Sequence, residues 1–275
     1  LLLTSDGMLY GVTQGGGKNL YTLTNNTVST NPVVTTRGTG TIYKVSKDGT
    51  QFATVHSFAS LDEAFDADTA TSDYLGFNDD GAFPYGGLLE VMDDAVGAVL
   101  IGVTTDGGNP VNDASESLPG LGVIYKVKLD GTGFDLLHKF KTSAESLPTG
   151  SLVNKDGLLY GIYSSGAVFS LNIQSKLYQV EPLSDSTITL GSNSGLSLSS
   201  SRNDFFGTTG TVGNCGYGNV YRLSMTGTLA SGYANCTVYD SSSTGGGGSM
   251  NKDWLWALLG LAVLAAAKRR IFGFN

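Results

Sequence analysis

Two histidines, His56 and His138, are the residues of this chain best suited to acid–base or metal chemistry. Both stand at one place in a repeated phrase, VHSF at 55–58 and LHKF at 137–140. The corresponding place further along the chain has no histidine, which argues against a symmetric metal site. We therefore expect both rings to pack or to form hydrogen bonds inside their repeats. The chain also lacks zinc-ligand spacing, a phosphate-binding loop and a GxSxG motif.

Carboxylates gather in the stretch LDEAFDADTATSDYLGFNDDG at 61–81. Asp66, Asp68 and Asp73 are its candidate calcium ligands, although the glycine and glutamate of a standard calcium loop are missing. The alternative is a solvated insertion. The neighbouring Asp93 and Asp94 are the type of pair that serves glycoside hydrolysis. The sequence predicts no cofactor, and calcium is the one metal candidate.

The composition indicates an exported protein. Charged residues make up 15% of the chain and the net charge is −8, so binding to a nucleic acid backbone is not expected. The two cysteines, Cys215 and Cys236, have one possible pairing, and we predict a disulfide between them in an oxidising compartment. The alternative is two buried thiols.

Four segments repeat one pattern of short apolar strands and polar turns. A polar turn is followed by an apolar pair and glycine, a Gly-rich loop, an aromatic strand, a turn and a last apolar strand. The segments lie at 5–17 with 38–58, at 97–109 with 120–140, at 155–183 and at 202–240. Asp-Gly at 6–7, 48–49, 130–131 and 156–157 predicts hairpins with primed turns, in which φ is positive. Each repeat is therefore expected to form four antiparallel strands.

The fold class predicted from these repeats is all-β. Four-stranded sheets of this size stack radially as the blades of a β-propeller. We expect about four blades, at 1–58, 84–140, 148–183 and 195–240, with the first one truncated. A Ser/Gly-rich linker at 241–249 and a hydrophobic tail at 250–275 follow them. Because the first repeat starts inside its first strand, we interpret the chain as the C-terminal part of a longer protein.

The repeat phrases identify a family resemblance. DGMLYGVTQGGG, GTIYKVSKDGT with VHSF, DDGAFPYGGLL and DGLLYGIYSSG resemble the GloVer tandem repeat of bacterial choice-of-anchor surface proteins. The resemblance covers residues 1–239, and the fourth repeat departs from it with Asn203-Asp204 in place of Asp-Gly. It implies an exported, propeller-like protein with no established activity and no catalytic residues.

The C-terminal tail has the layout of a sorting signal. A glycine-rich motif, Gly245, Gly246, Gly247, Gly248 and Ser249, precedes an apolar segment at 254–267. As a helix that segment is about 21 Å long, against about 30 Å for a hydrocarbon core. Trp254 and Trp256 flank it on one side, and Lys268, Arg269 and Arg270 on the other.

The tail resembles the GlyGly-CTERM signal of Gram-negative bacteria, from which it departs by the added residues 271–275. The resemblance implies a sorting protease of the rhombosortase type as partner, and release to the cell surface or the medium. The alternatives are a plain inner-membrane anchor facing the periplasm, a helix packed on the blades, and an engineered linker at GGGGS.

Function is expected in the connections that repeat three lacks, at 18–37, 59–83 and 109–119. Their aromatic residues Tyr21, Phe65, Tyr74 and Phe77 are suited to stacking on sugars or peptides. The preferred hypothesis is a non-enzymatic surface protein that binds protein or carbohydrate. The alternatives are a secreted propeller enzyme that acts on polysaccharide and a structural spacer.

Overall fold

The computed structural model describes residues 1–25, 33–61, 78–108, 120–141, 145, 150–163, 168–181, 196–199, 204–208, 220–224 and 229–231. Its regular secondary structure within these ranges consists of β-strands. The strands are β1 (Leu2–Leu3), β2 (Leu9–Thr13), β3 (Leu20–Asn25), β4 (Val33–Gly38), β5 (Thr41–Val45), β6 (Phe52–Ser57), β7 (Ala82–Asp93), β8 (Gly97–Asp106), β9 (Val123–Lys128), β10 (Asp135–Lys139), β11 (Val153–Lys155), β12 (Leu158–Ile162), β13 (Val168–Asn172), β14 (Tyr178–Glu181), β15 (Ser197–Leu198), β16 (Asp204–Thr208), β17 (Val220–Ser224) and β18 (Leu229–Ser231).

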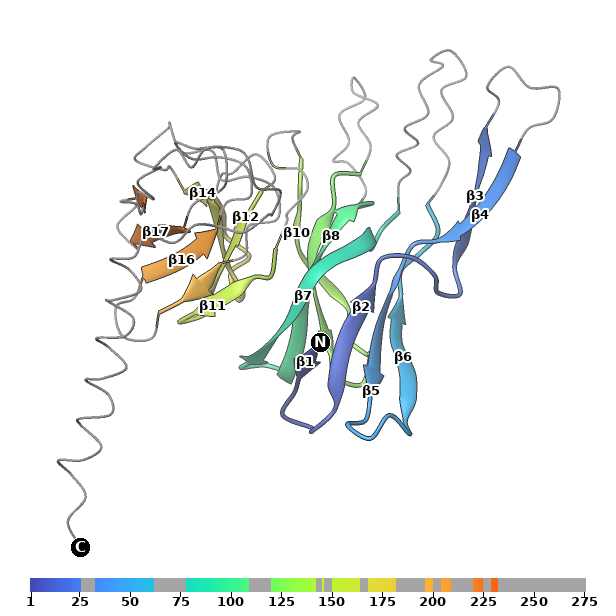
Figure 1. The fold of residues 1–275 in the computed structure, drawn as a ribbon, viewed down its shortest axis with the longest axis horizontal. Helices are drawn as coiled ribbons and strands as arrows, with labels where there is room; N and C mark the ends of the chain where they lie inside the picture. Colours follow the sequence, from blue (N-terminus) through green and yellow to red (C-terminus); the bar gives the residue numbers. More distant parts are fainter. Residues whose placement is uncertain are drawn as a thin grey trace, which may run out of the picture.

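These strands form four antiparallel sheets of four strands each, which confirms the predicted all-β class and the four-stranded units. The orders are β1-β2-β5-β6, β7-β8-β9-β10, β11-β12-β13-β14 and β15-β16-β17-β18. Strands that neighbour one another in a sheet also follow one another in the chain, apart from the separate β3–β4 ribbon, which lies between β2 and β5. The sheets succeed one another across Figure 1, from the blue first sheet to the orange fourth.

Among the described residues, the core consists of three apolar layers, each between two successive sheets, and a small separate cluster of Tyr21, Leu61 and Ala82. Tyr10, Ile42 and Phe58 of the first sheet pack on Leu100 and Tyr125 of the second. The second and third sheets bury another such layer, and a smaller one lies between the third and fourth. We call the face that packs on the next sheet the downstream face, and the opposite one the upstream face. A strand exposes alternate residues to its two faces, so one strand serves two layers.

The Asp-Gly turns differ in part from the predicted geometry. Only Asp156-Gly157 has both residues at positive φ, 52° and 82°, as a primed turn requires. At Asp6-Gly7, Asp48-Gly49 and Asp130-Gly131 the glycine alone has positive φ, and its N–H donates to the carbonyl three residues earlier. There the aspartate carboxylate accepts a hydrogen bond from the backbone N–H two residues later, for example that of Thr50. This bond between the aspartate side chain and the backbone favours a turn in which the glycine alone has positive φ.

Candidate functional site

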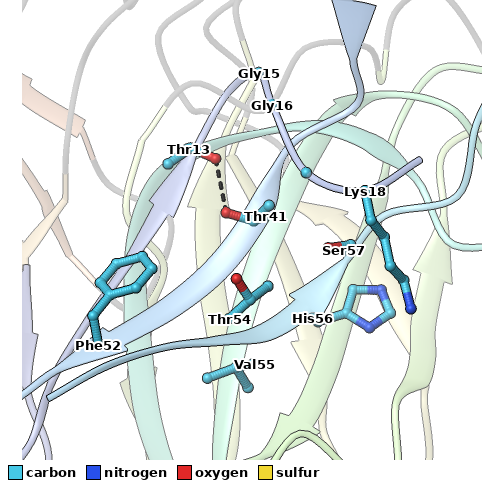
Figure 2. A pocket seen from close by; sticks show the side chains of 11 residues that line it. Thr13, Gly15, Gly16, Lys18, Thr41, Phe52, Thr54, Val55, His56 and Ser57 are labelled. Carbon is cyan, nitrogen blue, oxygen red and sulfur yellow. Dashed lines mark hydrogen bonds between the residues drawn. The ribbon is translucent and has the colours of Figure 1, made fainter. Parts of the chain in front are cut away.

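A shallow groove on the upstream face of the first sheet is the candidate site. It has a volume of about 510 Å³ and is lined by Thr13, Gly15, Gly16, Gly17, Lys18, Thr41, Phe52, Thr54, Val55, His56 and Ser57. The ends of β2, β5 and β6 and the Gly-rich loop after β2 position these residues (Figure 2). The β-register places Thr13 opposite Thr41 and Thr41 opposite Ser57, so three hydroxyl side chains share one face of the sheet.

The groove carries hydroxyl groups, the Lys18 ammonium and the rings of Phe52 and His56. The Thr13 and Thr41 hydroxyls are 2.8 Å apart and hydrogen bond to each other. Lys18 and the Gly15–Gly17 loop are exposed at one end, and Phe52 lies at the other with 68% of its surface exposed. Hydroxyls, backbone amides and an aromatic ring suit binding of a polar ligand or a polypeptide.

His56 has a structural arrangement. Its Nε2 atom lies 2.9 Å from Asp80 Oδ2, and the same carboxylate accepts a hydrogen bond from the Ala59 backbone N–H. The ring stacks on Phe134 at 4.2 Å between centroids. Neighbouring residues of a strand point to opposite faces, so Ser57 and His56 do not form a nucleophile–base pair. His56 fixes the connection that follows β6.

His138 repeats this placement one sheet later. Its ring stacks on Tyr178 of the third sheet at 3.6 Å and meets Phe140 edge to face. Burial, together with the nearby Lys141 charge, lowers the pKa of His138 to about 4. Both histidines do pack, as predicted, but the rings they stack on belong to the next sheet. The predicted packing inside one repeat is present in the edge-to-face contacts of His56 with Phe58 and of His138 with Phe140. The stacking partners in the next sheet were not predicted, because they depend on the outer-strand side chain projecting from the downstream face.

The carboxylate pair at 93–94 is divided between a buried and an exposed residue. Asp93 is 2% exposed and accepts a hydrogen bond from Lys126 Nζ at 2.9 Å and another from the Ala95 backbone N–H. The Lys126 hydrogen bond lowers the pKa of Asp93. Asp94 is exposed. Asp93 is therefore an ion-pair partner within the second sheet, and the two carboxylates do not face a common cleft.

The described part of the acidic connection contains Asp79 and Asp80. Among the described residues, no group of three or more His, Cys, Asp or Glu side chains could hold a metal ion. The candidate calcium ligands Asp66, Asp68 and Asp73 lie outside the described residues, and calcium binding there stays a prediction.

Tyr21 is placed differently from the expectation. Its side chain is 9% exposed and packs edge to face on Phe83 at 6.0 Å, beside Leu61 and Ala82. The expected role in stacking on a ligand is wrong for this residue, because β3 starts close to the core and its aromatic ring closes a small apolar cluster. Phe65, Tyr74 and Phe77 lie outside the described residues.

The predicted disulfide and the tail also lie outside the described residues. This holds for Cys215, Cys236, Gly245, Gly246, Gly247, Gly248, Ser249, Trp254, Trp256, Lys268, Arg269 and Arg270. Within the described ranges, no helix has the length and apolar character needed to cross a bilayer.

Sequence reasoning missed the groove itself. Thr13, Thr41 and Ser57 come from three strands, and their common face depends on the strand register and on the bulge between Ile42 and Tyr43. The one available signal was the phrase GVTQGGG, in which a threonine ends a strand directly before a glycine run.

No family model matches the chain, and no curated protein matches it. A chain of a crystallised nidogen/laminin complex is similar with 16% identity and a TM-score of 0.37, over 68% of this chain and 52% of that one. A structural genomics protein of unknown function from Bacteroides thetaiotaomicron VPI-5482 is similar with 14% identity and a TM-score of 0.44, over 82% of this chain and 50% of that one. This chain thus spans about half the length of each.

Proposed function

We propose that this protein is an exported, surface-sorted binding or display module, built as a propeller-like array of four-stranded blades. It has no catalytic role, and its ligand, a protein or a carbohydrate, is contacted by the inserted connections at 18–37, 59–83 and 109–119. The observation that carries the proposal is the way in which two of these inserts are attached to the sheets.

The inserts at 18–37 and 109–119 leave the first and second sheets at equivalent corners. The Gly40 N–H donates to the Gly16 carbonyl at 3.1 Å, and the Gly122 N–H donates to the Gly107 carbonyl at 3.0 Å. The first residue pair closes the base of one insert and the second pair closes the other.

Close backbone packing reinforces each base. A Cβ atom at Gly38 would lie 2.1 Å from the Gly16 carbonyl oxygen, and one at Gly120 would lie 2.3 Å from the Gly107 carbonyl oxygen. Only glycine fits such an approach. A rigid base that accepts inserts of different sequence and length is the arrangement by which repeat scaffolds present binding loops.

Surface sorting is supported by the tail resemblance alone. Cleavage within Gly245–Ser249 removes the apolar segment at 254–267 and frees the sheets from the membrane. Intact-mass measurement of the native protein tests this part of the proposal. A mature C-terminus within 245–249 supports sorting, whereas retention of residues 254–275 means a permanent anchor.

Loop-borne binding is tested with a variant in which residues 18–37 are replaced by Ser-Ser-Gly-Ala, the sequence that connects β12 to β13 at 164–167. The probes are a glycan array and a panel of soluble polysaccharides and surface proteins. We expect the parent chain to bind at least one probe and the variant to lose at least 10-fold in affinity while its β-sheet circular dichroism is retained. The melting temperature of the variant falls, because the replacement removes Tyr21 from its cluster with Phe83. Binding that survives removal of each insert in turn overturns the loop-borne site, and turnover of a polysaccharide overturns the non-enzymatic role.

A further inference from the structure

Two of the described interfaces between successive sheets, the first–second and the second–third, have the same composition. The second sheet carries a cross-strand aromatic pair, Tyr125 and Phe134, with ring centroids 5.4 Å apart. His56 and Phe58 of the first sheet cover this pair, His56 by stacking on Phe134 and Phe58 by meeting both rings edge to face. The outer strand of one sheet thus supplies a His-x-Phe cap to the upstream face of the next.

The third sheet is covered in the same way. Its aromatic pair is Phe169 and Tyr178, 5.6 Å apart. His138 stacks on Tyr178, and Phe140 packs on both rings at 6.0 and 6.3 Å. Two successive interfaces therefore use the same cap on the same pair.

The first sheet has the aromatic pair but, among the described residues, no cap on it. Tyr43 and Phe52 stack at 5.6 Å on its upstream face. Phe52 is 68% exposed, and Leu3 on the same face is 52% exposed. An apolar face with this much exposed aromatic and aliphatic surface is typical of an interaction surface.

The groove is the polar half of the upstream face of the first sheet. On the upstream face of the second sheet, the equivalent place is filled by the segment Asn78–Ala82. The Asn78 side-chain oxygen accepts hydrogen bonds from the N–H groups of Gly81 at 2.9 Å and Gly108 at 3.1 Å. Gly81 approaches so closely that a Cβ atom on it would lie 2.4 Å from Thr104 Oγ1 and 2.7 Å from Val123 Cγ2.

The residues beneath that segment correspond to the groove lining. Thr104, Val123 and Gly108 occupy the repeat positions that Thr13, Thr41 and Gly17 occupy in the first sheet. Thr104 and Val123 are 0% exposed under the segment. Thr13 and Gly17 are exposed. The groove has the shape and the backbone donors that receive an Asn-x-x-Gly turn in the next repeat.

We propose that the upstream face of the first sheet binds one more sheet of this repeat type, whose outer strand ends in His-x-Phe and continues into an Asn-x-x-Gly segment. The His-x-Phe cap covers Tyr43 and Phe52, and the Asn-x-x-Gly turn fills the groove at Thr13, Gly17 and Thr41. The partner is thus a polypeptide that presents His-x-Phe followed by an Asn-x-x-Gly turn, and the groove is part of a protein–protein interface.

A second copy of this chain has no free His-x-Phe cap in its described sheets. The His56–Phe58 cap is used on the second sheet and the His138–Phe140 cap on the third. Leu1 and Leu88 both point a Cδ2 atom at the strand glycine of their sheets, Gly11 and Gly102, so Leu1 occupies the position of Leu88. A sheet fused in front of Leu1 would therefore keep the register of the first and second sheets.

The test is a tandem protein in which a duplicate of residues 1–87 is joined directly in front of Leu1. The duplicate supplies one sheet, its His-x-Phe cap and the segment 78–87. It is connected to the original first sheet in the same way as the first sheet is connected to the second. The probe is Phe52→Cys in the original copy, alkylated with iodoacetamide and followed by peptide mass spectrometry. We expect alkylation at least 10-fold slower in the tandem protein than in the parent chain with the same substitution. Asp94→Cys, in an exposed turn of the second sheet, is the matched control, and its rate stays unchanged.

A second tandem protein carries Phe58→Ala and Asn78→Ala in the duplicate only. There we expect the alkylation rate at position 52 to return to that of the parent chain. Equal rates in parent and tandem proteins overturn the proposal, as does protection that survives the two substitutions. If the alkylation rate of the parent chain at position 52 falls as its concentration rises, the face serves self-association, and this result also overturns the proposal. None of these outcomes depends on ligand binding by the inserts or on processing of the tail.

Discussion

Gly102 lies directly beneath the ring of Tyr125, its partner across strands β8 and β9. A Cβ atom at Gly102 would lie 2.3 Å from the Tyr125 hydroxyl oxygen and 2.5 Å from Cζ. The same relationship joins Gly11 to Tyr43 and Gly161 to Phe169. In each of these three sheets the missing side chain lets an aromatic ring lie flat across the neighbouring strand, and that ring then forms part of the upstream face.

Gly102→Ala is expected to destabilise the protein by about 1–3 kcal/mol, because the added methyl group displaces a fully buried ring. Gly15→Ala is the matched control, since its Cβ atom has no neighbour closer than the Gly38 carbonyl oxygen at 3.8 Å. Urea denaturation of both variants measures the difference in the free energy of unfolding. Equal stabilities would mean that the ring moves aside without loss.

Tyr10→Phe is expected to cost about 1–2 kcal/mol, because the hydroxyl is held between two acceptors in a buried place. It lies 2.9 Å from the Asp6 carboxylate and 2.9 Å from the Leu129 carbonyl of the second sheet. Burial, with the hydrogen bond to Asp6, also raises the pKa of Tyr10. Tyr125→Phe is the control, since the Tyr125 hydroxyl is buried and has no hydrogen-bond partner. The control is expected to be neutral or stabilising in thermal unfolding, and a loss as large as that of Tyr10→Phe would contradict this account.

The repeats and their sheets could be predicted from the sequence because the signal is local. The apolar pair with glycine, the aromatic strand and the turn recur within each repeat, and alternation along a short strand sets its two faces. The aromatic residues Tyr43, Tyr125 and Phe169 were visible in the same way. Their packing on strand glycines was not, because it depends on the register between two strands.

Contacts between different sheets could not be predicted from the sequence. His56 and His138 occupy one repeat slot, and this correctly indicated packing. Their partners Phe134 and Tyr178 stand 78 and 40 residues further on, in different sheets. The groove was missed for the same reason, since its outline becomes visible only when the second sheet, with Asn78–Ala82 in place, is compared with the first.

The Asp93–Lys126 pair is expected to contribute more than the surface pair between Asp135 and Lys176. Both have N–O distances of 2.9 Å, but the Asp93 side chain is 1% exposed, whereas the surface pair is 42% and 44% exposed. Asp93→Asn leaves the mostly buried Lys126 ammonium with the Asp135 carboxylate, 3.9 Å away, as its remaining ion-pair partner, and should cost about 1–3 kcal/mol. Lys176→Gln should cost less than about 1 kcal/mol and lose its effect in high salt. Chemical denaturation at low and high salt measures both. Equal costs at both salt concentrations would show that burial does not set the strength of these pairs.

Stability is expected to fall between pH 7.5 and pH 5 because of His138. Its pKa is about 4 in the folded protein and near 6.5 in the unfolded chain, so the unfolded chain binds more protons in this interval. Stability is therefore full above pH 6.5 and decreases as the pH falls toward 4. Because the ring is partly exposed, we expect a loss of about 1 kcal/mol at pH 5.

His138→Phe isolates this contribution, since phenylalanine keeps the stack on Tyr178 and does not titrate. The measurement is the free energy of unfolding at pH 7.5, 6.5, 5.5 and 5, for the parent chain and the variant at equal ionic strength. The parent should lose more stability than the variant over this interval, and the difference should level off above pH 7. Parallel curves for the two proteins would mean that His138 keeps its ordinary pKa, and the buried stack between the second and third sheets would then tolerate a charged ring.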